Sequence, residues 1–290
     1  MNNILINQIM NQPFAMSEKD LTAFLNSLEK LDIQALSTKI GSPLDSERKT
    51  EVREGIAIIN IRGTILRYSD WITDALGLST TESISLEFNK ALTDKHIKGI
   101  IFNIDSGGGI ASAISELSTM IYNARGIKDI KTYIGGSGAS AAYWIGSSAK
   151  EVVISDTGIA GSIGAMLAYD DYSKMKEDMG IKEMTYISSI SPNKNADSEL
   201  QVMVDRLGQI FVENVARNRM TTTENVESNF GKGGLFVGND AVTAGLADKV
   251  GTFEGVLQSF QGSSSSLGGG LSANQSGLST KQKQLDLLNI

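Results

Sequence analysis

The sequence contains no cysteine among its 290 residues and only one histidine, His96. The absence of cysteine excludes disulfide bonds, thiolate metal sites and a cysteine nucleophile. His96 lies in a charged stretch between a helical pattern and an apolar run, which predicts a solvent-exposed connection. A Ser-His-Asp triad and a multi-histidine metal site are therefore not expected, because both need histidine at the reacting centre.

The chain also lacks the features of secreted and membrane proteins. Its first residues carry neither the basic flank nor the long apolar run of a secretory signal, and no stretch approaches the roughly 18 apolar residues of a membrane helix. The formal net charge is -7, so neither nucleic acid nor a membrane is an expected partner. We expect a protein of the cytosol, or of a particle assembled there, that requires no metal and no cofactor.

Strands and helices alternate through the middle of the chain. Apolar runs bounded by glycine predict buried strands, and amphipathic stretches between them predict helices. The predicted strands are 55–63, 99–104, 131–134, 151–154 and 183–187, and the predicted helices are 17–31, 81–92, 110–123, 140–145 and 197–219. This alternation predicts an α/β protein with a mainly parallel sheet and outer helices.

Composition divides the chain into three parts. Residues 1–50 form a polar lead-in with helical character, and residues 51–257 carry the alternating pattern. After Gly262 a run of serine and glycine predicts a flexible linker, so residues 258–290 are expected to be a linker and tail. The sequence leaves open whether the lead-in or the tail is removed by self-cleavage.

Ser140 is the first candidate for chemistry. It follows a predicted strand and a glycine-rich turn, and it begins a helix of small and apolar residues. Backbone amides and the positive end of the helix dipole lie close to a hydroxyl at this position. The alternative is that Ser140 serves only as an N-cap, a role in which serine is common.

Two further turns of small residues follow predicted strands, at 105–109 (DSGGG) and 161–164 (GSIG). Consecutive glycines let backbone amides approach a ligand closely, as an oxyanion hole requires. The first turn lacks the pattern of a phosphate-binding P-loop, and both turns have a purely structural alternative. The ends of strands are where open parallel sheets place their sites.

A serine nucleophile needs a proton acceptor, and the candidates here are lysines and carboxylates. A lysine serves when burial lowers its pKa enough to provide a neutral amine near pH 7. Lys194 lies in a loop with little net charge, whereas Lys174 and Lys176 lie in a charged run typical of a solvated helix face. Lys194 is the better candidate, and an ordinary loop lysine is the alternative.

Six motifs of this chain occur in a fixed order: 105–109 (DSGGG), 138–144 (GASAAYW), 161–164 (GSIG), 187–194 (ISSISPNK), 211–219 (FVENVARNR) and 245–248 (GLAD). Together they resemble the signal peptide peptidase A family of Ser–Lys proteases, and the last three resemble its phage head-maturation branch. The resemblance spans most of the middle part of the chain. It implies a Clp-protease/crotonase-like fold of repeated β-β-α units, assembled as a homo-oligomer.

The resemblance also implies roles for individual residues. Ser140 corresponds to the nucleophile and Lys194 to the general base, and the amides of Gly108 and Ala141 are expected to form the oxyanion hole. The residues expected to line the substrate cleft are Gly107, Gly109, Gly161 and Ser162. The family usually has proline where this chain has Gly107, so we expect a less rigid loop.

The implied function is that of a serine endopeptidase, which cleaves scaffold, capsid or portal proteins inside an immature phage head in the host cytoplasm, with self-cleavage as a further expectation. A cellular signal-peptide peptidase would share this chemistry but meets its substrates at a membrane. An acyl-CoA hydratase or isomerase would share the fold but needs acid–base carboxylates, which residues 135–146 lack. An inactive assembly protein would keep the fold without the reaction.

Overall fold

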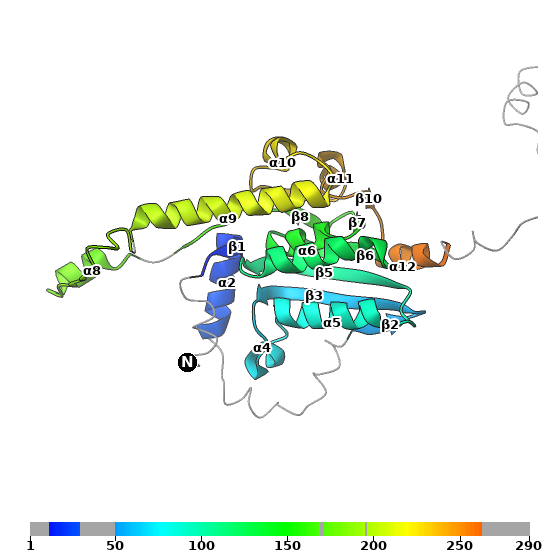
Figure 1. Cartoon of the computed structure of the whole chain (residues 1–290), viewed down its shortest axis with the longest axis horizontal. Helices are drawn as coiled ribbons and strands as arrows, with labels where there is room; N and C mark the ends of the chain where they lie inside the picture. The colour runs from blue at the N-terminus through cyan, green and yellow to red at the C-terminus, as the bar shows by residue number, and fades with distance from the viewer. Residues whose placement is uncertain (1–11, 30–49, 169–170, 195, 263–290) are drawn as a thin grey trace, which may run out of the picture.

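The computed structural model describes residues 12–29, 50–168, 171–194 and 196–262 (Figure 1). Expectations for the rest of the lead-in and for the tail beyond residue 262 lie outside these ranges. The main path of the sheet runs β10-β7-β6-β5-β3-β2. These strands are β10 (Lys249–Val250), β7 (Glu151–Ile154), β6 (Asp129–Ala139), β5 (Gly99–Ile110), β3 (Ile56–Leu66) and β2 (Glu51–Arg53). Neighbours on this path are parallel except β2 with β3, which confirms the α/β class.

Helices cover both faces of this sheet. One face carries the largest apolar cluster, shared with α5 (Thr81–Thr93), α6 (Ile114–Asn123), α7 (Ala141–Ser147) and α9 (Asp197–Asn218). The other face packs on α12 (Phe253–Gly262). In β5, Ile100 and Phe102 face the first cluster while Ile101 faces the second. Because successive side chains point to opposite faces, a strand covered on both sides is apolar throughout, as the sequence pattern indicates.

The long strands bend where their pairing shifts register, and they continue beyond the bend. β3 and β5 shift between Arg62 and Thr64, and β5 and β6 shift between Ile104 and Ser106. Past the bends, β3 pairs with β4 (Ser79–Thr80), and β6 pairs with β8 (Ile159–Gly161), which pairs with β9 (Leu235–Val237). A strand, a second strand segment and a helix thus repeat, as expected for β-β-α units. The predicted end of the second strand at residue 104 is wrong, because the glycines continue β5 as an extended strand.

Local sequence signals account well for α5. Thr80 is its N-cap: its hydroxyl accepts from the Ser83 amide at 3.0 Å, and the Ser83 hydroxyl accepts from the Thr80 amide at 3.3 Å. This reciprocal pair is a capping box, which satisfies two amides that the helix leaves without partners. The predicted start of this helix at residue 81 is therefore confirmed.

Residues 183–187 do not form the predicted strand. Residues 181–188 have neither helix nor strand structure and are exposed, and they follow the short helix α8 (Ser173–Asp178). A strand needs a partner for its backbone groups, and none of the described strands pairs with this segment. In Figure 1 one end of α9 extends beyond the sheet, and α8 and the turn before α9 lie at that end.

The sequence pattern did not predict β1 (Phe14–Met16), which precedes α2 (Glu18–Glu29). β1 pairs antiparallel with the end of β5. It belongs to a small apolar cluster made of Phe14, Met16, Leu21, Phe24, Leu66, Ile72 and Ile110, to which α4 (Trp71–Ala75) contributes. The described portion of the lead-in is thus packed onto the central part of the chain.

Candidate active site

Ser140 occupies the junction between β6 and α7. Its backbone has φ 54° and ψ -122°, a conformation that costs on the order of 1–3 kcal/mol outside glycine. The residue is 1% exposed, and its amide donates to the Gly161 carbonyl at 2.8 Å. Its hydroxyl makes no capping hydrogen bond, so the N-cap alternative lacks its usual energetic basis. A strained serine between a strand and a helix is the arrangement found in nucleophile elbows.

The glycine segment of β5 lies directly against Ser140. A Cβ atom on Gly108 would lie 3.0 Å from Ser140 Cβ and 3.1 Å from the Ala141 nitrogen, and it would collide with the Ala15 carbonyl oxygen. Gly108 also has φ 110°, a region that other residues rarely adopt. Gly109 is equally confined, because a Cβ there would collide with the Ile65 backbone. The close approach of these backbone segments therefore requires glycine.

The two expected oxyanion donors meet at this contact. Ala141 is the first residue of α7, and amides in a first helical turn have no acceptor within the helix. The Gly108 amide donates to Ser106 Oγ at 3.2 Å, while the Ser106 hydroxyl donates to the Gly63 carbonyl at 2.5 Å. The Gly108 amide must leave Ser106 before it serves an oxyanion, so its role stays a prediction.

The third turn of small residues reaches the same place. Gly161 ends β8 and pairs with Ala139 of β6, directly before Ser140. Ser162 follows with φ 54°, and its amide donates to the Gly234 carbonyl at 2.8 Å. The structure thus gathers all three predicted turns around Ser140. Their role in lining a substrate cleft stays a prediction.

Lys194 does not reach Ser140 in this arrangement. It is exposed in the turn before α9, where its amide donates to the Ser191 carbonyl at 3.1 Å. Lys174 is exposed as well, and Lys176 forms an ion pair with Glu183. Within the described ranges no lysine hydrogen-bonds the Ser140 hydroxyl. The identity of the general base therefore stays a prediction.

The predicted surface position of His96 is confirmed. Its side chain is 96% exposed, and its ring contacts only the neighbouring Asp94 carboxylate among the described residues, at 3.1 Å. His96 is thus no candidate for a proton acceptor at Ser140.

Arg125 holds the far end of α7, the helix that Ser140 begins. Its guanidinium donates to the carbonyls of Ser147, Ser148 and Ala149 at 3.0, 2.8 and 2.7 Å. The last carbonyls of a helix have no partner within it, so these bonds replace the missing ones. Burial lowers the pKa of Arg125 below its ordinary value. No pattern in the sequence predicts this role, because Arg125 lies outside every motif.

Asn218 at the end of α9 connects the same region. Its buried side-chain amide donates to the hydroxyls of Ser118, Ser147 and Ser148 at 3.1, 2.9 and 3.0 Å. Earlier in α9, Phe211 stacks on Trp144 of α7, with ring centroids 4.3 Å apart. α9 therefore holds α7 in place through both polar and aromatic contacts, and residues of the motif at 211–219 make these contacts.

Arg219 and Asp248 join that motif to the one at 245–248. They form a bidentate pair with N–O distances of 2.7 and 3.0 Å. Burial alone would raise the pKa of Asp248, but its bonds to Arg219 and to the Val152 amide, with the positive charge of Arg219, bring that pKa below its ordinary value. Beside them the Tyr143 hydroxyl of α7 donates to the Leu246 carbonyl at 2.9 Å, and burial raises the Tyr143 pKa.

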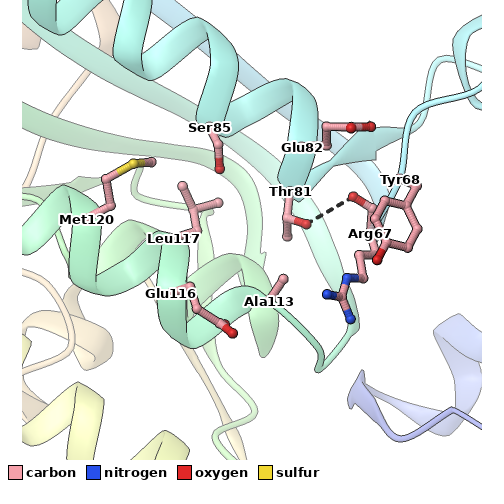
Figure 2. A pocket seen from close by; sticks show the side chains of 9 residues that line it. All are labelled: Arg67, Tyr68, Thr81, Glu82, Ser85, Ala113, Glu116, Leu117 and Met120. Carbon is pink, nitrogen blue, oxygen red and sulfur yellow. Dashed lines mark hydrogen bonds between the residues drawn. The ribbon is translucent and has the colours of Figure 1, made fainter.

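A surface pocket lies away from Ser140, between the beginnings of α5 and α6 (Figure 2). Its lining residues are Arg67, Tyr68, Thr81, Glu82, Ser85, Ala113, Glu116, Leu117 and Met120. Figure 2 shows the Thr81 hydroxyl donating to the Arg67 carbonyl, at 3.1 Å. The pocket contains none of the residues predicted to act with Ser140.

The described residues contain no group of three or more histidine, cysteine, aspartate or glutamate side chains placed to hold a metal ion. None of the helices within these ranges combines the length and the apolar character needed to cross a bilayer.

An α/β protein with a strained serine at a helix start, surrounded by glycine-rich backbone, has the framework of a serine hydrolase. Residues 123–265 match the model of peptidase family S49. Capsid assembly protease C of Escherichia phage lambda is 25% identical over 236 residues, which are 78% of this chain and 53% of the phage protein. The head-tail preconnector protein GP5 of Enterobacteria phage P21 is 26% identical over 70% of this chain and 42% of its own length. Protease 4 of Haemophilus influenzae is 27% identical over 68% and 33%, respectively.

These matches confirm the resemblance predicted from the motifs: the chain is similar to the S49 peptidases. It spans about half, or less, of the length of these curated relatives. Among solved structures, the membrane-bound stomatin-specific protease 1510-N covers 72% of this chain and 85% of its own, with a TM-score of 0.45 and 15% identity. An enoyl-CoA hydratase from Shewanella pealeana covers 76% and 75%, with a TM-score of 0.46 and 9% identity.

Proposed function

We propose that this chain is a serine endopeptidase and that Ser140 is its nucleophile. The observation that carries the proposal is the strained backbone of Ser140 at the start of α7, held against Gly108 of β5 and bonded to Gly161 of β8. Strain of this kind persists only where the surrounding structure maintains it, and it concentrates at functional sites. A serine used only to cap a helix needs no such conformation.

The reaction is acyl transfer. A neutral lysine takes the Ser140 proton while the serine oxygen attacks a peptide carbonyl, and the backbone amides of Ala141 and Gly108 stabilise the resulting oxyanion. The lysine then gives the proton to the leaving amine, and water releases the acyl group by the same route. Loss of one oxyanion donor typically costs a factor of about a hundred to a thousand in rate.

We propose Lys194 as the base. In this proposal, assembly with a second copy of the chain brings Lys194 of one copy to Ser140 of the other. The segment that precedes Lys194 exposes large apolar side chains that an isolated chain leaves in water. They are Met175, Met179, Ile181, Met184, Tyr186 and Ile190. Exposed large apolar side chains concentrated in one segment are typical of interaction sites. A homo-oligomer that covers this segment would move Lys194 into contact with another subunit.

The substrates that we propose are proteins of an immature phage head. Two of the relatives are a capsid assembly protease and a head-tail preconnector protein, both from phages. A scaffold, capsid or portal protein cut within that particle is the expected substrate, and the chain itself is a further one. An inactive assembly protein is the second candidate, and the exposed position of Lys194 favours it.

Cleavage of candidate scaffold protein followed on a gel tests this function. The wild type is compared with Ser140→Ala, with Lys194→Ala, and with Lys182→Ala as a control at another exposed lysine. We expect the wild type and the control to cut and the other two variants to be silent while folded. Equal cleavage by Lys194→Ala would exclude Lys194 as the base. A wild type that never cuts would favour the assembly protein.

A further inference from the structure

β1 lies between two segments that flank Ser140. On one side it pairs antiparallel with the glycine segment of β5, with Phe14 opposite Ile110, Ala15 opposite Gly109 and Met16 opposite Gly108. On the other side it forms a bridge to Met166, which lies a few residues beyond the third turn. β1 thus lies between the glycine segment of β5, which contacts Ser140, and the segment that follows Gly161, the residue bonded to the Ser140 amide.

The hydrogen bonds of β1 alternate between these two neighbours. Phe14 exchanges both of its backbone bonds with Met166, each at 2.8 Å, while the Pro13 carbonyl accepts from the Ala111 amide at 3.0 Å. This alternation belongs to a strand inserted between two others. Recognition of an extended peptide by strand addition uses the same main-chain bonds and places little demand on the side chains.

The inserted strand reaches the catalytic centre itself. The Ala15 carbonyl oxygen lies against Gly108, on the side where Ser140 Cβ and the Ala141 amide also approach. The Asp20 carboxylate of α2 covers Gly107, since a Cβ there would lie 2.9 Å from Asp20 Oδ2. This cover agrees with the 1% exposure of Ser140.

We propose that residues 13–16 occupy the groove in which a peptide substrate binds, so that the chain blocks its own nucleophile until this strand leaves. The proposal deepens the proposed peptidase function and rests on it for the nature of the ligand. A strand of the same chain has an effective concentration on the order of millimolar, so it excludes a free peptide of equal affinity at micromolar concentration. Displacement of β1 is therefore the step that opens the site.

Few contacts hold the strand, which makes its release feasible. β1 has only three residues, and its two large apolar side chains, Phe14 and Met16, pack in the small cluster with α2 and α4 rather than in the main core. Short strands with few neighbours open at the low end of the range of local unfolding free energies. The main core contains Ala15 alone from this strand, so it stays intact when β1 leaves.

A disulfide that locks β1 in place tests the proposal. Phe14 and Ile110 face each other next to the hydrogen-bonded pair of Pro13 and Ala111, so they form a non-hydrogen-bonded pair with Cα atoms about 4.5 Å apart. That separation suits a disulfide, and the chain contains no other cysteine. The double variant Phe14→Cys/Ile110→Cys is prepared in the full chain, and its oxidised form is compared with its reduced form. The probe is a fluorescent peptide of residues 11–18, NQPFAMSE, whose binding is read by anisotropy.

We expect the oxidised form to bind the peptide at least about tenfold more weakly than the reduced form. The locked strand cannot be displaced, whereas the reduced strand lacks the buried Phe14 side chain that the peptide keeps, so the peptide has the higher affinity and displaces it. The matched control is Val52→Cys/Ala57→Cys, which locks the antiparallel pair of β2 and β3 at the far edge of the sheet and should leave binding unchanged on oxidation. Equal binding by both forms of the Phe14–Ile110 variant would overturn the proposal, as would the absence of binding by the reduced form.

Hydrolysis is measured in parallel, so that the two proposals fail separately. If binding follows the expected pattern and no form cleaves any peptide, the groove assignment stands and the peptidase function fails. If the reduced and oxidised forms cleave a peptide equally well, the peptidase function stands and β1 is a fixed structural element.

Discussion

The strain at Ser140 predicts an unusual response to substitution with glycine. The observed backbone conformation has a free-energy cost on the order of 1–3 kcal/mol for a residue other than glycine and almost no cost for glycine. Glycine loses more conformational entropy on folding, which costs about 0.5–1 kcal/mol relative to alanine. The difference favours Ser140→Gly over Ser140→Ala by roughly 1 kcal/mol, with an upper value of about 2.5 kcal/mol.

Thermal unfolding of the two variants measures this difference. Both lack the hydroxyl and are expected to be inactive, so alanine is the matched control for loss of the side chain. One kcal/mol corresponds to about 2–4 °C in melting temperature for a domain of 150–250 residues, so Ser140→Gly should melt a few degrees above Ser140→Ala. If Ser140→Gly melts below Ser140→Ala, the backbone at this residue is not strained and the main support for its catalytic role is lost.

Three further predictions concern the network that holds α7 and the origin of the base. The pKa of Asp248 is lower in the folded protein, so its pair with Arg219 stabilises the fold above the ordinary carboxyl pKa, 3.8, and this stability is lost as the pH falls through the lower folded-state pKa. The melting temperature of Asp248→Asn should therefore fall less than that of the wild type between roughly pH 5 and pH 3. Identical pH profiles of the two melting temperatures would exclude Asp248 from acid unfolding. Asn218→Ala removes the amide that donates to three buried serine hydroxyls, although Ser118 still accepts from Arg217 and bonds Ser148, and should cost about 1–3 kcal/mol in urea unfolding. Asn229→Ala at the exposed end of α10 (Thr223–Asn229) should change the free energy of unfolding by less than about 0.5 kcal/mol. If Lys194 acts on a neighbouring copy, an equal mixture of Ser140→Ala and Lys194→Ala subunits should recover about a quarter of wild-type cleavage after co-refolding, whereas no recovery would place both residues in one chain.

Short-range signals predicted much of the fold. The apolar run at 151–154 has the bounds of β7, and Thr80 marks the start of α5, because both depend on neighbouring residues alone. The glycines after residue 104 predict a turn, since glycine is frequent in turns, but the structure needs them because adjacent backbones approach closely. That reason depends on tertiary contacts and is invisible in a local window.

Long-range packing explains the remaining differences. β1 has only three residues, and its extended form depends on pairing with β5 and Met166, far away in the sequence. The segment 183–187 has the apolar pattern of a strand but finds no partner among the described strands. The motifs predicted that Ser140 lies next to these glycines, because each motif lies at or near the end of its own strand. The position of Lys194 depends instead on the path of a long connection, which local sequence does not determine.

Trapping of the acyl-enzyme tests the nucleophile most directly. The wild type is incubated with a peptide ester, quenched in acid and digested, and the fragment of residues 132–150 is sequenced by mass spectrometry, with Ser140→Ala treated in the same way. The account predicts that the acyl group is attached to Ser140, and not to Ser137, Ser147 or Ser148 of the same fragment, and that the variant carries no label. Cleavage of the ester with the acyl group on another residue, or with equal labelling of Ser140→Ala, would contradict it.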